Sequence, residues 1–160
     1  EYPELNPEFV FTVPGFNMRS TELNAVIGLN QLKRLDNNNK KRCENFKYFL
    51  ENLDAEKYFT DFDLEGSVNY AFVLLLRNPD DDLFQRVCDC LRKEKVEFRR
   101  GTSGGGNQLR QPYIRKRYPG MNPEEFVNAD YIHYYGMYIG NYPTLEKDKI
   151  LQLCTLLNDL

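Results

Sequence analysis

Residues 15–36 read GFNMRSTELNAVIGLNQLKRLD, a polar turn followed by a helical pattern. Its first residues form a polar turn in which Ser20 or Thr21 is suited to cap a helix, because the hydroxyl can accept a hydrogen bond from an exposed backbone N–H. Asn17 and Arg19 stand just ahead of that helix N-terminus, where anions bind well. The stretch therefore predicts a long, capped helix with polar groups gathered at its start.

Outward from this helix, hydrophobic spacing predicts further helices and strands. The helical pattern continues past 37–39, as one helix or as two with a kink near residue 38. A continuous apolar run at 68–76 predicts a central strand buried on both faces. The other expected elements are a strand at 9–13, a helix from Asp80, a strand at 96–98, a loop at 101–122, a helix from 123 to about 131, a strand at 135–140 and a helix after 144. This order predicts an α+β fold: a small sheet of about three to four strands flanked by helices, with a long N-terminal helix.

The composition limits the classes of protein to which this chain can belong. The chain has 160 residues, 41% of them hydrophobic and 28% charged, which is ordinary for a soluble globular domain. Its net charge of −3 counts against a general nucleic-acid binder. No apolar run approaches the roughly 20 residues of a membrane span. The four cysteines form no CxxC pair and the chain has one histidine, so we expect no metal site. We expect a cytoplasmic protein without a membrane or nucleic-acid partner.

The segment 101–113, GTSGGGNQLRQPY, has the features of a ligand site. Consecutive glycines let the backbone approach a ligand and present N–H groups to an anion. The surrounding segment 99–117 carries six basic residues and no acid, which suits a phosphate-bearing small molecule. It is no P-loop, because no Gly-Lys-Ser/Thr follows. A flexible loop without a ligand and a solvated run of charge are the alternatives.

His133 is the single imidazole of the chain. No Ser or Cys forms a familiar nucleophilic arrangement with it in the sequence, so we interpret it as structural. The carboxylate pair Asp80 and Asp82 is better explained as the start of a helix than as an acid–base pair.

The stretch 15–36 also resembles a signature of the DegT/DnrJ/StrS family of sugar aminotransferases, roughly Gly-aromatic-Asn-x-Arg-x-Thr-Glu-x-x-Ala-x-x-Gly-x-x-Gln-Leu-x-x-Leu-Asp. The matching positions are Gly15, Phe16, Asn17, Arg19, Thr21, Glu22, Ala25, Gly28, Gln31, Leu32, Leu35 and Asp36. The segment 129–143 is similar to the closing strand and turn of that family's C-terminal domain. The resemblance implies a fold-type-I enzyme that depends on pyridoxal 5′-phosphate (PLP), acts on nucleotide-linked keto sugars and serves polysaccharide or lipopolysaccharide biosynthesis.

The same resemblance implies a division of labour between domains. Residues 20–160 match the small C-terminal domain, and 1–19 match an interdomain segment next to the cofactor. The Schiff-base lysine and most of the PLP site belong to a large N-terminal domain that this chain does not contain, so no catalytic residue is expected here. In the family's homodimer, the residue that matches Asn17 reaches the cofactor phosphate of the partner subunit, and Arg19 matches a position near it.

The loop departs from most of the family. Its Gly-Asn-x-x-Arg-Gln-Pro core resembles a branch that includes PLP-dependent 3-dehydratases of nucleotide-linked 4-keto-6-deoxy sugars. The substrate-binding residues that we predict are Gly104, Gly105, Gly106, Asn107, Gln108, Arg110 and Tyr113. The leading hypothesis is an aminotransferase that takes its amino group from glutamate. The alternatives are a 3-dehydratase and a non-catalytic binding module derived from this domain.

Overall fold

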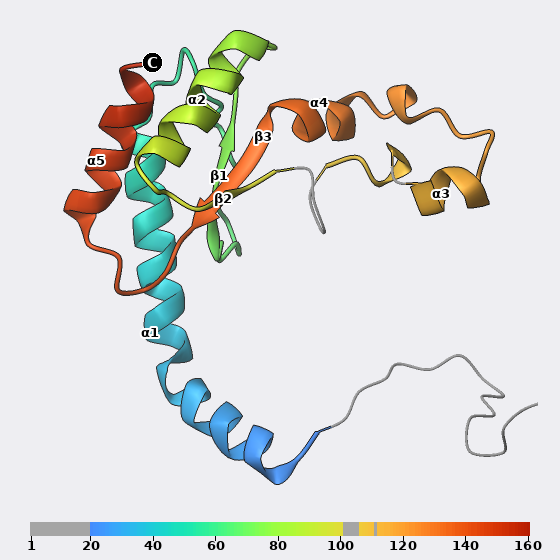
Figure 1. The fold of residues 1–160 in the computed structure, drawn as a ribbon. Coiled ribbons are helices and arrows are strands. Elements are labelled where there is room, and N and C mark those ends of the chain that lie inside the picture. The colour runs from blue at the N-terminus through green and yellow to red at the C-terminus, as the bar shows by residue number, and fades with distance from the viewer. Residues whose placement is uncertain (1–19, 101–105, 111) are drawn as a thin grey trace, which may run out of the picture. The chain divides into compact units, whose positions relative to one another are not determined.

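The computed structural model describes residues 20–100, 106–110 and 112–160. The predicted site residues Asn17, Arg19, Gly104 and Gly105, and the expected strand at 9–13, lie outside these ranges. The described elements are α1 (Glu22–Asn52), β1 (Ala71–Leu75), α2 (Asp81–Lys93), β2 (Phe98–Arg99), the 3₁₀ turn η2 (Gln108–Arg110), α3 (Pro112–Arg117), the 3₁₀ turn η3 (Pro123–Glu125), α4 (Val127–Tyr135), β3 (Gly136–Gly140) and α5 (Lys147–Asn158) (Figure 1). The chain divides into two compact units, 1–35 and 36–160.

Helix α1 runs unbroken through 37–39, so the alternative of two helices is wrong. The hydroxyl of Thr21 accepts a hydrogen bond from the backbone N–H of Asn24 at 3.3 Å, which confirms the expected cap. Large aliphatic side chains in the first half of α1 are 43–75% exposed: Leu23, Val26, Ile27, Leu29, Leu32 and Leu35. At 100° per residue they lie all around the helix, a distribution typical of a helix that further polypeptide surrounds.

The sheet is antiparallel with the strand order β1-β3-β2. Its register pairs Phe72 with Ile139 and Arg99 with Tyr138. The expected central strand at 68–76 is therefore wrong in two respects: β1 is shorter, and it lies at an edge of the described sheet. The short β3 limits how many residues of β1 can pair, and burial alternates along β1, so that one face is more deeply buried than the other.

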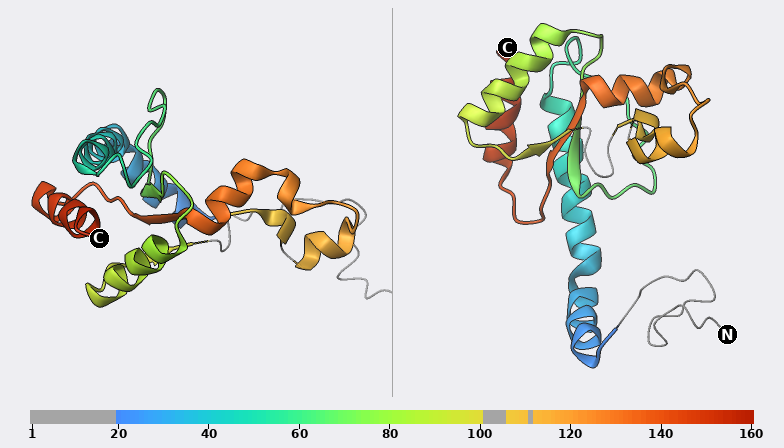
Figure 2. Two further views of the ribbon diagram at one scale, coloured as in Figure 1. Left: turned by 90° about the horizontal axis from the view of Figure 1, so that it is seen from above. Right: turned by 45° about the vertical axis from the view of Figure 1, so that its right-hand side comes forward.

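One face of the sheet forms the core. Phe72 and Ile139 on this face pack among buried side chains of α1, α2 and α5, and the ring of Phe49 stacks on Phe72 with centroids 4.6 Å apart. The apolar stripe expected on the last helix is buried, as predicted: Ile150, Leu153, Cys154 and Leu157. Figure 2 shows these helices on one side of the sheet and α4 on the other. Among the described residues, no helix has the length and apolar character that crossing a bilayer requires.

A buried amide ties the end of the sheet to α1. The Nδ2 atom of Asn141 donates to the carbonyl oxygens of Arg42 and Asn69 at 3.0 and 2.9 Å. Its Oδ1 atom accepts from Nδ2 of Asn45 at 3.2 Å. Asn141 is 2% exposed, and these bonds satisfy its side chain without water. The network fixes the turn that follows β3 against the helix.

The expected loop at 101–122 is wrong in part, because it contains η2 and α3. Pro112 is suited to the first position of α3, since its missing N–H would have no helical partner there. The last turn of α3 holds Arg115, Lys116 and Arg117, where positive charge favours the helix dipole. The strand expected at 96–98 lies at β2 instead. The helix expected from 123 begins as η3, and α4 continues beyond 131 to Tyr135.

Candidate functional site

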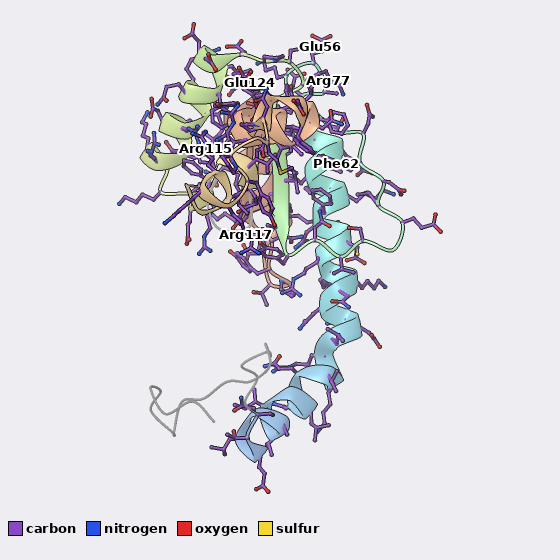
Figure 3. All side chains as sticks on the ribbon, turned by 90° about the vertical axis from the view of Figure 1, so that its right-hand side faces the viewer. Glu56, Phe62, Arg77, Arg115, Arg117 and Glu124 are labelled. Carbon is purple, nitrogen blue, oxygen red and sulfur yellow. The ribbon has the colours of Figure 1, made fainter. Side chains whose placement is uncertain are left out.

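The second face of the sheet carries a groove of about 440 Å³. Side chains alternate along each strand, so Val73, Tyr138 and Arg99, which are paired across the sheet, point to this face together. Gly106 and Ile132 border the groove from the segments that follow β2 and from α4. Figure 3 looks at the molecule from this side. A larger groove of about 740 Å³ shares Arg99 and Tyr138, but its remaining lining comes largely from α5 and 94–98.

A cluster of polar groups stands at the groove. The rings of Tyr70 and Tyr138 meet edge to face with centroids 6.0 Å apart. A hydrogen bond with the side chain of Tyr138 raises the pKa of Tyr70, and another raises the pKa of Arg99. The Nη2 atom of Arg99 also lies 3.4 Å from Oε1 of Glu97. A guanidinium beside phenol hydroxyls is chemically suited to phosphate oxygens and sugar hydroxyls.

The wall opposite α4 is aromatic. Phe62, labelled in Figure 3, lines the groove and packs against Phe46 of α1 with ring centroids 5.9 Å apart. Val68 and Val73 extend this apolar wall. The groove therefore combines an apolar side with the polar cluster at Arg99, which is the usual composition of a small-molecule site.

The basic run of 99–117 does not form one anion site. Arg100 also borders the groove, but its guanidinium lies over the ring of Phe84, 4.6 Å from the centroid. Arg110 is paired with a carboxylate, and Arg117 lies over the ring of its neighbour Tyr118 at 5.8 Å. Arg115 and Arg117 project from α3 (Figure 3). The structure thus separates charges that the sequence places close together.

Two predicted site residues meet in one network with Asp130 of α4, and we call these three residues the clasp. The Nε and Nη2 atoms of Arg110 donate to Oδ1 and Oδ2 of Asp130 at 2.5 and 2.6 Å. The Nδ2 atom of Asn107 donates to the same Oδ1 at 3.2 Å and to the carbonyl oxygen of Pro123 at 2.9 Å. Hydrogen bonds from Arg110 and Asn107 hold the pKa of Asp130 below its usual range. The predicted donors Asn107 and Arg110 are therefore engaged within the chain.

The remaining predicted residues are dispersed. Gly106 borders the groove and has φ +78°, a conformation that favours glycine. Gln108 lies exposed in η2, and Tyr113 belongs to α3. Among the described residues, the Nδ1 atom of His133 is buried without a hydrogen-bond partner.

Sequence reasoning missed Tyr70, Tyr138 and Asp130. The two tyrosines could be placed at the groove only once the strand register was known, since a shift of one residue would move Tyr138 to the other face. Asp130 has no local signal, because its partner Arg110 lies 20 residues earlier in the chain. Arg99 was visible as part of the basic run, but its place at the groove was not.

Comparisons with known proteins agree with this architecture. A family model described as the DegT/DnrJ/EryC1/StrS aminotransferase family matches residues 4–158. GDP-4-keto-6-deoxy-D-mannose 3-dehydratases of Escherichia coli O55:H7 and Yersinia pseudotuberculosis are 24% and 26% identical over 148 and 150 residues. These matches cover 92% and 93% of this chain, which spans 38% of each relative's length.

A solved structure shares the fold. It is the crystal structure of a GDP-4-keto-6-deoxymannose-3-dehydratase with a trapped PLP-glutamate geminal diamine. It superimposes with a TM-score of 0.74 at 24% identity, covering 98% of this chain and 40% of that protein's chain. The likeness confirms the α+β fold of a fold-type-I PLP enzyme's smaller part.

Proposed function

Because the chain belongs to the DegT/DnrJ/EryC1/StrS aminotransferase family, we propose that it is the C-terminal domain of a larger PLP-dependent enzyme acting on a nucleotide-linked keto sugar. Two observations support the larger enzyme. The chain spans 38% of the length of its curated relatives. Large aliphatic side chains are spread around the first half of α1 and are exposed, as expected where a further domain packs.

The observation that carries the substrate class is the groove at Arg99. A diphosphate needs a cation, and Arg99 lines the groove with its side chain 62% exposed. The hydroxyls of Tyr70 and Tyr138 are placed to accept from or donate to sugar hydroxyls beside it. In this proposal Arg99 binds the diphosphate, and the wall at Gly106 borders the sugar.

The described lining of the groove does not itself fit the cofactor. It contains arginine and tyrosine but no lysine, so it has no amine to join the PLP aldehyde. In our proposal the large domain binds most of PLP, and Asn17 and Arg19 approach its phosphate from a homodimer partner. The described residues supply substrate contacts, and we derive no chemical step from them.

Two reactions fit this framework. The family's description favours transamination, and we propose glutamate as the amino donor. Dehydration at carbon 3 is favoured by the names of the two curated relatives, both 3-dehydratases of a GDP-linked 4-keto-6-deoxy sugar. A third relative, 25% identical over 150 residues, is a lipopolysaccharide biosynthesis protein of Salmonella typhimurium, which supports a role in lipopolysaccharide synthesis. In our proposal the enzyme acts in the cytoplasm.

Product analysis tests the proposal. The full-length protein would be loaded with PLP, mixed with GDP-4-keto-6-deoxymannose and glutamate, and the sugar product identified by mass spectrometry. An amino sugar formed together with 2-oxoglutarate supports transamination, and a 3-deoxy product supports dehydration. An unchanged sugar, together with a protein that retains no PLP, would contradict both reactions. The remaining hypothesis would then be a non-catalytic binding module.

A further inference from the structure

We propose that the clasp is a positioning device: Asn107, Arg110 and Asp130 hold together two walls of the groove, and Arg110 acts on the substrate through Asp130 rather than by touching it. This inference rests on the proposed function for its effect on binding. The claim that the clasp holds two segments of the chain together does not depend on a ligand.

The guanidinium of Arg110 already pairs with the carboxylate of Asp130. Two of its N–H groups face the two oxygens of one carboxylate, the bidentate geometry that gives the strongest pairing between these groups. Its guanidinium also lies over the ring of Tyr134, 5.0 Å from the centroid. Both charged side chains are 17% exposed. A phosphate that took the Nε and Nη2 donors of Arg110 would have to displace Asp130, which would leave a largely buried carboxylate without its partner.

Asn107 extends the pairing to the backbone. Its side chain is 4% exposed, and its Oδ1 atom accepts from the backbone N–H of Leu109 at 3.1 Å. Its Nδ2 atom joins Asp130 to the carbonyl oxygen of Pro123. The amide thus ties η2 to η3 and to α4.

The clasp joins two segments that border the groove. Gly106, the neighbour of Asn107, borders the groove on one side. Asp130 belongs to α4, which contributes Ile132 and leads into Gly136 and Tyr138 on the groove's other side. The clasp therefore connects the wall at Gly106 with the wall at α4.

A double-mutant cycle in the full-length protein separates positioning from direct contact. GDP is the probe, and calorimetry gives its dissociation constant for Arg110→Ala, Asp130→Ala and the double variant. We expect each single change to weaken GDP binding about tenfold and the double variant to be no weaker than either, because each removes the same bidentate contact. The exchanged pair Arg110→Asp with Asp130→Arg should recover part of the affinity. Suppose instead that Asp130→Ala keeps the GDP affinity unchanged or raises it, while Arg110→Ala lowers it. Arg110 would then contact the substrate directly, and the inference would be wrong.

Hydrogen exchange in the same variants tests the clasp without a ligand. Backbone amides at 106–110 should exchange faster in both single variants, while those of β1 and β3 stay unchanged. Arg92→Ala is the matched control, since it removes an exposed ion pair with Asp89 at 2.7 Å on α2. Unchanged exchange at 106–110 would overturn the clasp. Faster exchange together with a wild-type protein that binds no GDP would support the clasp and contradict the proposed substrate.

Discussion

Replacement of Asn141 by alanine probes the link between the sheet and α1. The change removes two donated hydrogen bonds, to the carbonyl oxygens of Arg42 and Asn69, and one accepted from Asn45. Asn45 keeps its second bond, to the carbonyl oxygen of Tyr142 at 3.2 Å. The alanine methyl group leaves a small void where water has little access, because Asn141 is 2% exposed.

The magnitude follows from these contacts. Each lost hydrogen bond costs about 1 kcal/mol net, so the change should lower the free energy of unfolding by about 3 kcal/mol. That is a large share of the roughly 5–15 kcal/mol of a typical domain. Asn141→Asp should lower the free energy of unfolding at least as much. The carboxylate keeps the accepting oxygen, but its second oxygen replaces the Nδ2 donor and faces the carbonyl oxygens of Arg42 and Asn69.

Urea unfolding followed by circular dichroism measures the effect. With an m-value of about 2 kcal/mol per molar, a loss of about 3 kcal/mol lowers the midpoint by roughly 1.5 M. Asn128→Ala is the control, because Asn128 is exposed on α4 and should change stability by less than about 0.5 kcal/mol. A midpoint for Asn141→Ala within 0.3 M of wild type, taken as about a fifth of the expected shift, would refute the reasoning.

Three further predictions concern the groove, a helix cap and a buried thiol. Arg99→Ala should weaken GDP binding by the full-length protein several-fold, whereas Lys93→Ala should not; equal affinities in calorimetry would remove Arg99 from the site. Asp80→Ala should lower the free energy of unfolding by about 1 kcal/mol, since Asp80 accepts the Leu83 N–H at 2.8 Å, and Asp80→Asn should restore it in urea titrations. Burial raises the pKa of the Cys154 thiol from 9.0 to about 11. The neutral buried thiol therefore contributes fully to the free energy of unfolding below pH 9, and this contribution is lost as pH rises to 11. Cys154→Ala should flatten this alkaline decline, and an identical decline in both proteins would contradict the assignment.

Local chemistry made much of the fold predictable. The cap at Thr21, the cap at Asp80 and the apolar stripe of α5 each depend on residues within one or two turns, and each is observed. Strand order was not predictable in the same way. A run of apolar residues predicts burial, but whether β1 or β3 is central depends on pairing between segments more than 60 residues apart.

The site shows the same division between local and distant information. The glycine-rich segment was visible from composition, and Gly106 does border the groove. The role of Arg110 could not be predicted, because the acid that pairs with it is distant in sequence. The charge of a segment also does not show whether an arginine in it is paired. Asn17, Arg19, Gly104 and Gly105 stay predictions, since they lie outside the described residues.

A crystal structure of the full-length protein with PLP and a GDP-linked sugar tests the central claim most directly. We expect the diphosphate within hydrogen-bond distance of the Arg99 guanidinium, the sugar against Gly106 and Tyr138, and the Arg110–Asp130 pair intact. A sugar nucleotide bound away from this groove, or a phosphate on Arg110 in place of Asp130, would contradict it.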